Sequence, residues 1–299
     1  MTQPKLSVVV ISYNMKRELP RTILSLSTKM QRDIAEDDYE IIVVDNGSSE
    51  PLDTDAYLKL GGNIQIHFLS QSSPSPVAAI NYGLSLAPGL LVGVFIYGAR
   101  IASPRLLATA LDAACLHKKP VIGSLGFHLG PEIQTESIKK GYCQAEEDKL
   151  LASVNWLEDG YRLFDISVFA ASSADGWFTI PNETNSLFLT QEHWQELGGY
   201  DANFLSPGGG LVNPDMWTRA CQDPKARVIL LLGEATFHQV HGGVATNAKE
   251  CHPWPIFHEE YIRIRGKSFA RPDVNPFFVG HLNRSILSSV WLSAQKKFL

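Results

Sequence analysis

The 299-residue chain has few cysteines, no long apolar run and no excess of basic residues. Its four cysteines are widely spaced and form no CxxC pair, which argues against a disulfide framework and for reduced thiols in a cytoplasm. No stretch approaches the length of about 18 apolar residues that a membrane span needs. The 26 basic and 31 acidic side chains give a net charge of −5, which disfavours a nucleic-acid-binding protein.

The two ends of the chain are expected to form a strand and a helix. The N-terminal run MTQPKLSVVVISYN turns polar after a short apolar stretch, which is typical of a strand rather than of a signal peptide. The C-terminal run SILSSVWLSAQKKFL predicts an amphipathic helix that ends with Lys296 and Lys297. We therefore expect a cytoplasmic protein whose last helix packs on the body or makes a weak contact with a membrane surface.

Apolar runs and helical patterns alternate over the first 130 residues. Strands are predicted at LSVVVIS (6–12), YEIIVVD (39–45), IQIHFLS (64–70), LLVGVFIY (90–97) and PVIGSLGF (120–127), with helices near 19–30, 77–87 and 103–118. Ser103 is predicted to cap the last of these helices, just before Pro104. This alternation predicts an α/β fold with a mixed, mostly parallel sheet covered by helices.

The rest of the chain is less regular. An aromatic-rich segment at 131–180 is predicted to be inserted into a domain spanning 1–245, with 246–299 as an extension packed on that domain. Between these lie a strand (185–190), a helix (191–198), the loop SPGGGLVNPD (206–215), a helix through Arg219, a strand (227–232) and an irregular C-terminus.

Polar residues follow four of the predicted strands. Because ligands bind at the carboxyl ends of strands in open parallel sheets, these residues are expected to face one crevice. They are Ser12-Tyr13-Asn14, Asp45-Asn46-Gly47-Ser48, Ser70, and the segment from Tyr97 to Arg100.

The segments SVVVISYN, YEIIVVDNGSSE and ELGGYDANF, in this order and spacing, resemble the family 2 glycosyltransferases of GT-A fold. The segments GARIASP, SPGGGLVNPD and FHQVHGG are similar to a bacterial subgroup. The resemblance implies a nucleotide-diphospho-sugar transferase-like fold. It also implies transfer of a sugar from a nucleotide-sugar donor to a glycan or lipid-linked acceptor hydroxyl, with inversion, in surface polysaccharide or glycoconjugate synthesis.

The same resemblance implies a role for individual residues. Asp215, after the glycine-rich loop, stands where the family places its general base, although a plain helix cap is the competing interpretation. Glu183, Asn185 and Gly209 are candidates for contact with the acceptor or the donor sugar. The nucleotide side would consist of Tyr13 and Asn14 on the nucleoside, Asp45 on the base, Asn46 and Ser48 near the ribose, and Asn81 on the diphosphate.

One expected feature is missing. The family's two acidic residues that coordinate Mn²⁺ or Mg²⁺ correspond to Tyr97 and Ala99, so a divalent cation is doubtful. Arg100 would then hold the diphosphate, helped by Tyr97 and by His238 or His241.

Two other interpretations stay open at this point. The chain can be a non-catalytic relative that binds a nucleotide or a glycan. It can also be a zinc-dependent hydrolase, built on His238 and His241 with Cys251, His252 and His258 nearby.

Overall fold

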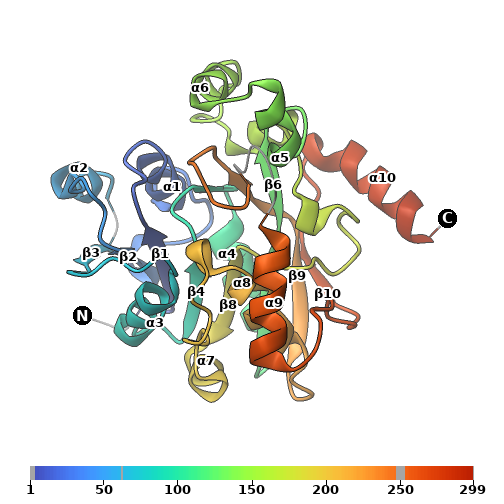
Figure 1. Ribbon diagram of the computed structural model, residues 1–299. Helices are drawn as coiled ribbons and strands as arrows, with labels where there is room; N and C mark the ends of the chain where they lie inside the picture. The colour runs from blue at the N-terminus through green and yellow to red at the C-terminus, as the bar shows by residue number, and fades with distance from the viewer. Residues whose placement is uncertain (1–3, 62, 247–252, 299) are drawn as a thin grey trace.

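The structure is a computed structural model that describes residues 4–61, 63–246 and 253–298, and it confirms the predicted α/β fold with a mostly parallel sheet (Figure 1). The sheet has the order β10-β9-β6-β8-β4-β1-β2-β3, with β5 paired to β9 and β7 paired to β6. Its strands are β1 (Leu6–Ser12), β2 (Tyr39–Asp45), β3 (Asn63–Phe68), β4 (Leu91–Phe95), β5 (Arg100–Ala102), β6 (Pro120–Leu129), β7 (Ser167–Phe169), β8 (Ser186–Thr190), β9 (Arg227–His238) and β10 (Phe277–Gly280).

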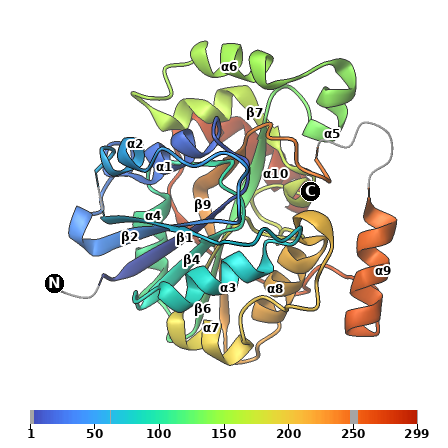
Figure 2. The ribbon, with the colours of Figure 1, turned by 60° about the vertical axis from the view of Figure 1, so that its left-hand side comes forward.

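Helices cover both faces of this sheet (Figure 2). One apolar core joins the sheet to α3, α7 and α8, and a second joins it to α1, α2 and α4. The helices are α1 (Leu19–Leu26), α2 (Thr54–Leu58), α3 (Val77–Leu86), α4 (Leu106–Ala114), α5 (Gln134–Ser137), α6 (Gln144–Ala152), α7 (Gln191–Leu197), α8 (Val212–Cys221), α9 (Trp254–Arg265) and α10 (Leu287–Phe298).

The central strands are buried from end to end. Every residue of β1 and of β2 is buried, and β1 lies between its parallel neighbours β2 and β4. A sheet covered on both faces needs such continuous β-branched runs, which explains why the bounds of both strands could be predicted. Helix α3 approaches β1 closely, because a Cβ on Gly83 would lie 2.4 Å from Cγ1 of Val9. The glycine is therefore needed for this helix to pack on the sheet.

Strand β9 is longer than predicted and carries a bulge. Gly123 of β6 pairs with Leu230, but Leu125, two residues later, pairs with Ala235, so β9 has gained three extra residues between these positions. Gly233 lies inside the bulge with a φ of +86°. Beyond it β9 continues to His238, which pairs with Arg100 of β5.

The segment 131–180 and the C-terminal residues share a third apolar core beside β6 and β9. The indole Nε1 of Trp177 donates a hydrogen bond to Ser289 of α10 at 2.9 Å, so the two parts contact each other directly. The expectation of an irregular C-terminus was wrong, because α9, β10 and α10 are regular and β10 extends the main sheet. The division into a domain, an insertion and an extension stays a prediction.

One local prediction was also wrong, and one short helix was missed. Ser103 does not cap α4, because its hydroxyl donates to the buried carboxylate of Glu234 and its position precedes the first helical residue, Leu106, by three. A short helix that was not predicted, α2, lies between β2 and β3, and Asp53 caps it by accepting a hydrogen bond from the backbone N–H of Ala56. Within the described ranges, none of the helices has the length and apolar character that a membrane crossing requires.

Candidate active site

A cavity of about 620 Å³ lies at the carboxyl ends of β1 and β4, where the sequence predicted a ligand crevice. The loops after β1, β2 and β4 form one side of the cavity, and the glycine-rich loop and the segment after β9 form the other. The predicted site residues that line it are Tyr13, Asn14, Asn46, Tyr97, Arg100, Glu183, Asn185, His238 and His241.

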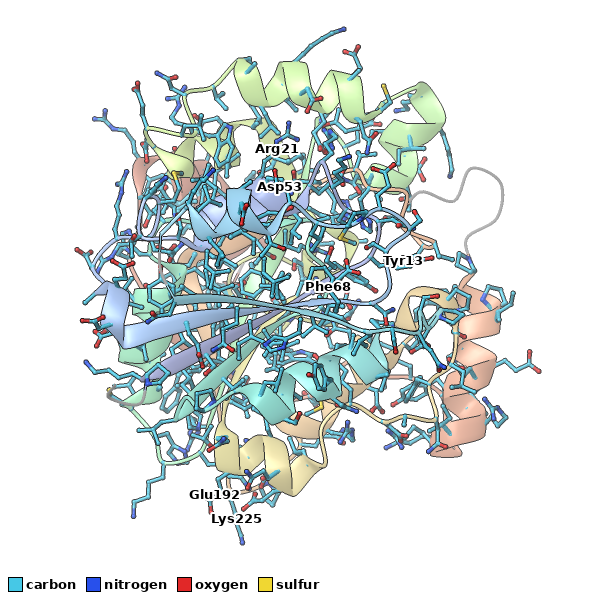
Figure 3. The ribbon with its side chains drawn as sticks, turned by 90° about the vertical axis from the view of Figure 1, so that its left-hand side faces the viewer. Tyr13, Arg21, Asp53, Phe68, Glu192 and Lys225 are labelled. Carbon is cyan, nitrogen blue, oxygen red and sulfur yellow. The ribbon has the colours of Figure 1, made fainter. Side chains whose placement is uncertain are left out.

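The loops after β1 and β2 are bound to each other. Asn14 has a φ of +52°, a backbone conformation that asparagine tolerates better than most residues, and its N–H donates to Ser48 Oγ at 2.8 Å. Its side-chain oxygen accepts from the N–H of Ser49 at 2.9 Å. These contacts hold Tyr13, which lines the cavity and is 47% exposed. Figure 3 labels its side chain.

Asp45 closes the turn after β2. One carboxylate oxygen accepts from the N–H groups of Gly47 and Ser48 at 3.1 and 2.7 Å, and the other accepts from the Ser48 hydroxyl at 2.6 Å. Asp45 and Ser48 are not among the residues that line the cavity, so their predicted contacts with a nucleotide stay predictions. Asn46 does line it, with a buried side-chain oxygen that has no hydrogen-bond partner.

Tyr97 holds the glycine-rich loop in place. Its hydroxyl donates to the carbonyl oxygen of Gly208 at 2.6 Å, and burial raises the pKa of this hydroxyl, so Tyr97 stays a donor. Gly208, Gly209 and Gly210 all have positive φ values, which other residues rarely adopt. Gly208 and Gly210 line the cavity, whereas a Cβ on Gly209 would lie 2.9 Å from Val212 Cγ1. The predicted contact of Gly209 with a sugar stays a prediction.

Arg100 and Asn185 both line the cavity and lie near each other at its buried end. Arg100 is only 4% exposed and Asn185 only 2%. Nε and Nη1 of Arg100 and both amide atoms of Asn185 are buried without a hydrogen-bond partner. A Cβ on Gly126 would lie 3.6 Å from Arg100 Nη1 and 3.6 Å from Asn185 Nδ2, so the two polar groups lie against the same point of β6. Buried polar groups normally have partners, so this pair is suited to form hydrogen bonds with a ligand in the cavity.

Three histidines stand beside Arg100. His238 and His241 join through their Nε2 atoms at 3.0 Å, and the ring of His128 lies 5.5 Å from that of His238. Burial lowers the pKa of His128 to about 3 and that of His241 to about 4, and the pKa of His238 is also well below its usual value. The charge of Arg100 contributes to all three shifts. The histidines are therefore neutral at pH 7, and Arg100 carries the positive charge among these four residues.

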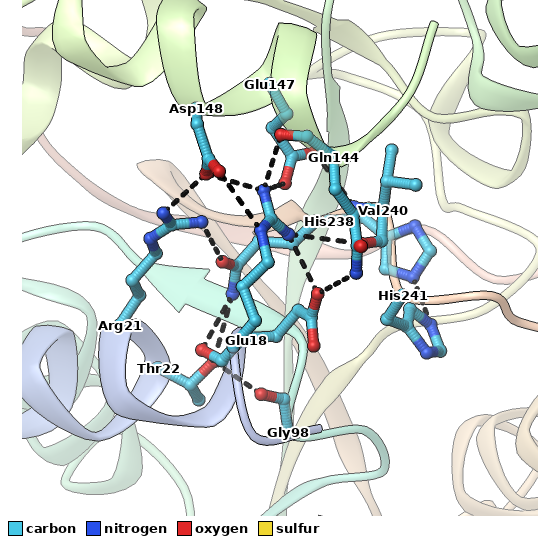
Figure 4. A network of polar contacts seen from close by, with 12 residues as sticks. Glu18, Arg21, Thr22, Gly98, Gln144, Glu147, Asp148, His238, Val240 and His241 are labelled. Atoms are coloured by element: carbon cyan, nitrogen blue, oxygen red, sulfur yellow. Dashed lines mark hydrogen bonds and ion pairs between the residues drawn. The ribbon is translucent and has the colours of Figure 1, made fainter. Parts of the chain in front are cut away.

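A polar network fixes the segment that carries these histidines (Figure 4). The buried carboxylate of Glu147 on α6 accepts from the N–H of Val240 at 2.8 Å and from Arg17 at 3.0 Å. The amide of Gln239 donates to the backbone of Glu18 at 3.1 Å. Helix α6 of the 131–180 segment therefore helps to position His238 and His241.

Glu183 is the one carboxylate among the described residues that line the cavity. Asn213 holds it, since its amide nitrogen donates to Glu183 Oε2 at 2.9 Å and to the carbonyl of Thr184 at 3.0 Å. The other oxygen of Glu183 has no hydrogen bond within the described structure and remains available to a ligand. Asn213 was not singled out from the sequence, although it stands only two residues before the predicted base.

Asp215 lies outside the cavity. It is the fourth residue of α8, so it does not cap this helix, and it is 1% exposed. Arg219 binds it from the next turn at 2.9 Å, and Arg265 of α9 binds both of its oxygens at 2.6 and 2.7 Å. Residues two apart on a helix point in different directions, which puts Asn213 in the cavity and Asp215 between helices. Its role as general base stays a prediction that this geometry does not favour.

Asn81 also has a different place from the one expected. Its amide nitrogen donates to the carbonyl of Tyr200 at 2.8 Å, and its oxygen accepts from the N–H of Tyr200 at 2.9 Å. The side chain is thus used to hold the loop after α7 against α3. It is not among the residues that line the cavity, so its predicted contact with the diphosphate stays a prediction.

The zinc interpretation finds no support in the residues that the structure describes. They contain no group of three or more His, Cys, Asp or Glu side chains that could hold a metal ion. Two members of the imagined cluster, Cys251 and His252, lie outside the described residues. His258 instead accepts a hydrogen bond from the N–H of Phe269 at 3.3 Å.

The fold is that of the GT-A, nucleotide-diphospho-sugar transferase-like class. Residues 7–95 match the family model described as "Glycosyl transferase family 2". The resemblance seen in the sequence is therefore confirmed over residues 7–95, where the chain is similar to the family 2 glycosyltransferases. The match ends five residues before Arg100, so the buried end of the cavity lies beyond it. A search of curated proteins found no match.

Solved structures support the same fold. TarS 1–349 from S. aureus in complex with UDP-GlcNAc superposes with a TM-score of 0.55 at 17% identity, covering 87% of this chain and 65% of TarS 1–349. The mannosyltransferase PcManGT from Pyrobaculum calidifontis, in complex with GDP-Man and Mn²⁺, gives 0.52 at 14% identity, covering 100% of this chain and 71% of its own. The chain spans about 60% of another TarS 1–349 structure, with a TM-score of 0.50 at 15% identity.

Proposed function

We propose that the protein transfers a sugar, with inversion, from a nucleotide-sugar donor to an acceptor hydroxyl. The observation that carries this proposal is the cavity at the ends of β1 and β4, two strands that lie in the part of the chain matching the family 2 glycosyltransferase model. Its volume of about 620 Å³ lies in the range of small-molecule sites. The bound UDP-GlcNAc of TarS and GDP-Man of PcManGT belong to those proteins and support a nucleotide-sugar here as well.

In this proposal the nucleoside lies against Tyr13, Asn14 and Asn46. Tyr13 offers an exposed aromatic ring at the edge of the cavity, suited to stacking on a base or packing on a ribose. The unpaired oxygen of Asn46 can accept a hydrogen bond from the same ligand. The sugar and the acceptor then lie farther in, between the glycine-rich loop and Glu183.

Glu183 is the proton acceptor of the proposed reaction. The acceptor oxygen attacks the anomeric carbon and gives its proton to Glu183, while the bond from that carbon to the diphosphate oxygen breaks. Glu183 is chosen over Asp215 because it lines the cavity and has one oxygen free, whereas two guanidinium groups bind Asp215. A carboxylate in this role contributes roughly 10²–10⁴-fold to the rate.

A role in surface polysaccharide or glycoconjugate assembly is the pathway we infer, with a glycan or lipid-linked acceptor. Helix α10 supports a lipid-linked one, because Trp291, Leu292 and Phe298 are more than half exposed. Its last turn carries Lys296 and Lys297, and the helix contains no acidic residue. Such a helix suits the surface of an anionic membrane in the cytoplasm, where lipid-linked acceptors are held.

The proposal is tested with UDP, GDP, dTDP and CMP in a thermal-shift panel, followed by a transfer assay with sugars linked to the nucleotide that binds. A ligand at about 100 times its Kd adds ~2.7 kcal/mol of stability, a shift of about 2 °C or more for a chain of this size. A shift with one nucleotide and release of that nucleoside diphosphate during transfer is the expected result. A nucleotide that binds without any turnover would instead identify a non-catalytic relative.

A further inference from the structure

The residues at the expected cation site do not fit a divalent metal ion. Tyr97 uses its hydroxyl to hold Gly208, and Ala99 is completely buried in the apolar core. Mg²⁺ and Mn²⁺ prefer several oxygen ligands, usually carboxylates. Among the described residues that line the cavity, Glu183 alone offers a carboxylate, and no group of three metal-binding side chains exists in the described ranges.

A buried cation stands at the same place. Arg100 follows directly on Ala99, is 4% exposed, and its Nε and Nη1 have no hydrogen-bond partner. No described carboxylate forms an ion pair with it, although the charge of Glu183 acts on it from farther away. Burial lowers the pKa of Arg100 to about 10, so the guanidinium stays charged at pH 7. A buried charge without a partner is unfavourable, and a negatively charged ligand would remove this penalty.

The neighbours of Arg100 add hydrogen-bonding groups without adding charge. The amide of Asn185 lies against the same point of β6 as the guanidinium and has no partner. His238, which pairs with Arg100 across β5 and β9, is neutral and has an unpaired Nδ1. A guanidinium with its planar set of N–H donors, flanked by an amide, matches the oxygens of a phosphate group.

We propose that Arg100, together with Asn185 and His238, binds the diphosphate of the donor directly and takes the place of a divalent cation. This inference rests on the proposed function. As the bond from the anomeric carbon to the diphosphate oxygen breaks, the electron pair goes to that oxygen, and the fixed charge of Arg100 stabilises the leaving nucleoside diphosphate. The acceptor oxygen forms the new bond to the anomeric carbon, and its proton goes to Glu183.

The test is calorimetric titration of the whole protein with the nucleoside diphosphate found in the panel and with the matching nucleoside, each in EDTA and in Mn²⁺. The diphosphate is expected to bind equally well under both conditions. Arg100→Met should weaken diphosphate binding at least tenfold while nucleoside binding stays the same. Arg105→Met is the matched control, because Arg105 pairs with Asp33 and does not line the cavity, and it should change neither affinity.

Unfolding of the ligand-free variants separates binding from structure. Since Nε and Nη1 of Arg100 have no hydrogen-bond partner among the described residues, Arg100→Met should melt at or above the wild-type temperature. A marked drop would mean that Arg100 is structural and would overturn the proposal. Binding that requires Mn²⁺, or unchanged diphosphate binding by Arg100→Met, would overturn it while leaving the proposed function intact. Absence of nucleotide binding in both EDTA and Mn²⁺ would overturn the proposed function itself.

Discussion

Arg265 binds both carboxylate oxygens of Asp215, with Nε 2.6 Å from Oδ1 and Nη2 2.7 Å from Oδ2. This contact joins α9 to α8, and a second ion pair from Arg265 to Asp201 at 2.8 Å extends it to the loop after α7. Hydrogen bonding to Asp215 is also the main cause of the raised pKa of Arg265. The carboxylate that the sequence marks as a base is therefore part of the link between α8, α9 and the loop after α7.

Asp215→Asn should destabilise the protein and leave its chemistry intact. The substitution leaves two guanidinium groups facing a neutral amide, and we expect a loss of about 2–4 kcal/mol because the Asp215 end of the pair is fully buried. Chemical denaturation measures this loss. Below its melting temperature the variant should keep the wild-type kcat, and a kcat reduced a hundredfold or more would restore Asp215 as the base.

Glu183→Gln should have the opposite effect. The amide keeps the size of the side chain and can still accept from Asn213, but it cannot take a proton, so transfer should fall about 10²–10⁴-fold. Calorimetry should show nucleotide binding within about twofold of wild type, since the change lies on the acceptor side. Retention of the wild-type kcat would exclude Glu183 as the proton acceptor.

Tyr97→Phe removes one hydrogen bond from the glycine-rich loop. The carbonyl of Gly208 loses its donor, at a cost of about 1 kcal/mol, and the loop should close less firmly over the donor. Steady-state kinetics should show a higher KM for the nucleotide-sugar with a smaller change in kcat. Tyr82→Phe serves as the control, because Tyr82 is exposed on α3 and does not line the cavity.

The free energy of unfolding should depend on pH because of Glu147. Burial raises its pKa from 4.5 to about 7, despite the opposing effects of Val240 and Arg17. Between these two values the folded protein holds a proton that the unfolded chain releases, so this contribution to stability is full below pH 4.5 and is lost as the pH rises through 7. Melting temperatures of wild type and Glu147→Gln between pH 5 and 8 should therefore differ in slope, with the variant losing less on the alkaline side. Parallel curves would contradict this assignment.

Contact of α10 with a membrane can be measured by sedimentation with vesicles that contain anionic lipid. The wild-type protein should bind these vesicles weakly and release them at high salt, because Lys296 and Lys297 supply part of the attraction. Trp291→Glu should abolish binding without affecting the melting temperature, since this side chain is 65% exposed. Equal binding by the variant would mean that α10 is not the contact.

The sequence predicted those strands and helices that have a continuous or periodic pattern of apolar residues. The bounds of β1 and β2 are confirmed because a strand buried on both faces must be apolar throughout. Strand β10 was missed because FFVG is only four residues long and is held by pairing with β9, nearly fifty residues earlier in the chain. Such pairing leaves no periodic signal in the sequence.

The sequence predicted where the cavity lies but not all of the residues that line it. The strand-end rule located Tyr13, Asn46 and Arg100 at one cavity, because that rule depends only on topology. It could not tell Asn213 from Asp215, since only the rotation of α8 decides which of them faces the ligand. The partner of Asn81 was equally hidden, because Tyr200 lies more than a hundred positions away along the chain.

The bulge in β9 decides which face of the sheet His238 occupies. Successive strand residues point to opposite faces, so the odd number of extra residues between Leu230 and Ala235 reverses the alternation for the remainder of the strand. Deleting one residue there would turn Phe237 toward the ligand and His238 into the apolar core. The side chains that line the cavity therefore depend on the number of residues in a part of β9 that does not itself line the cavity.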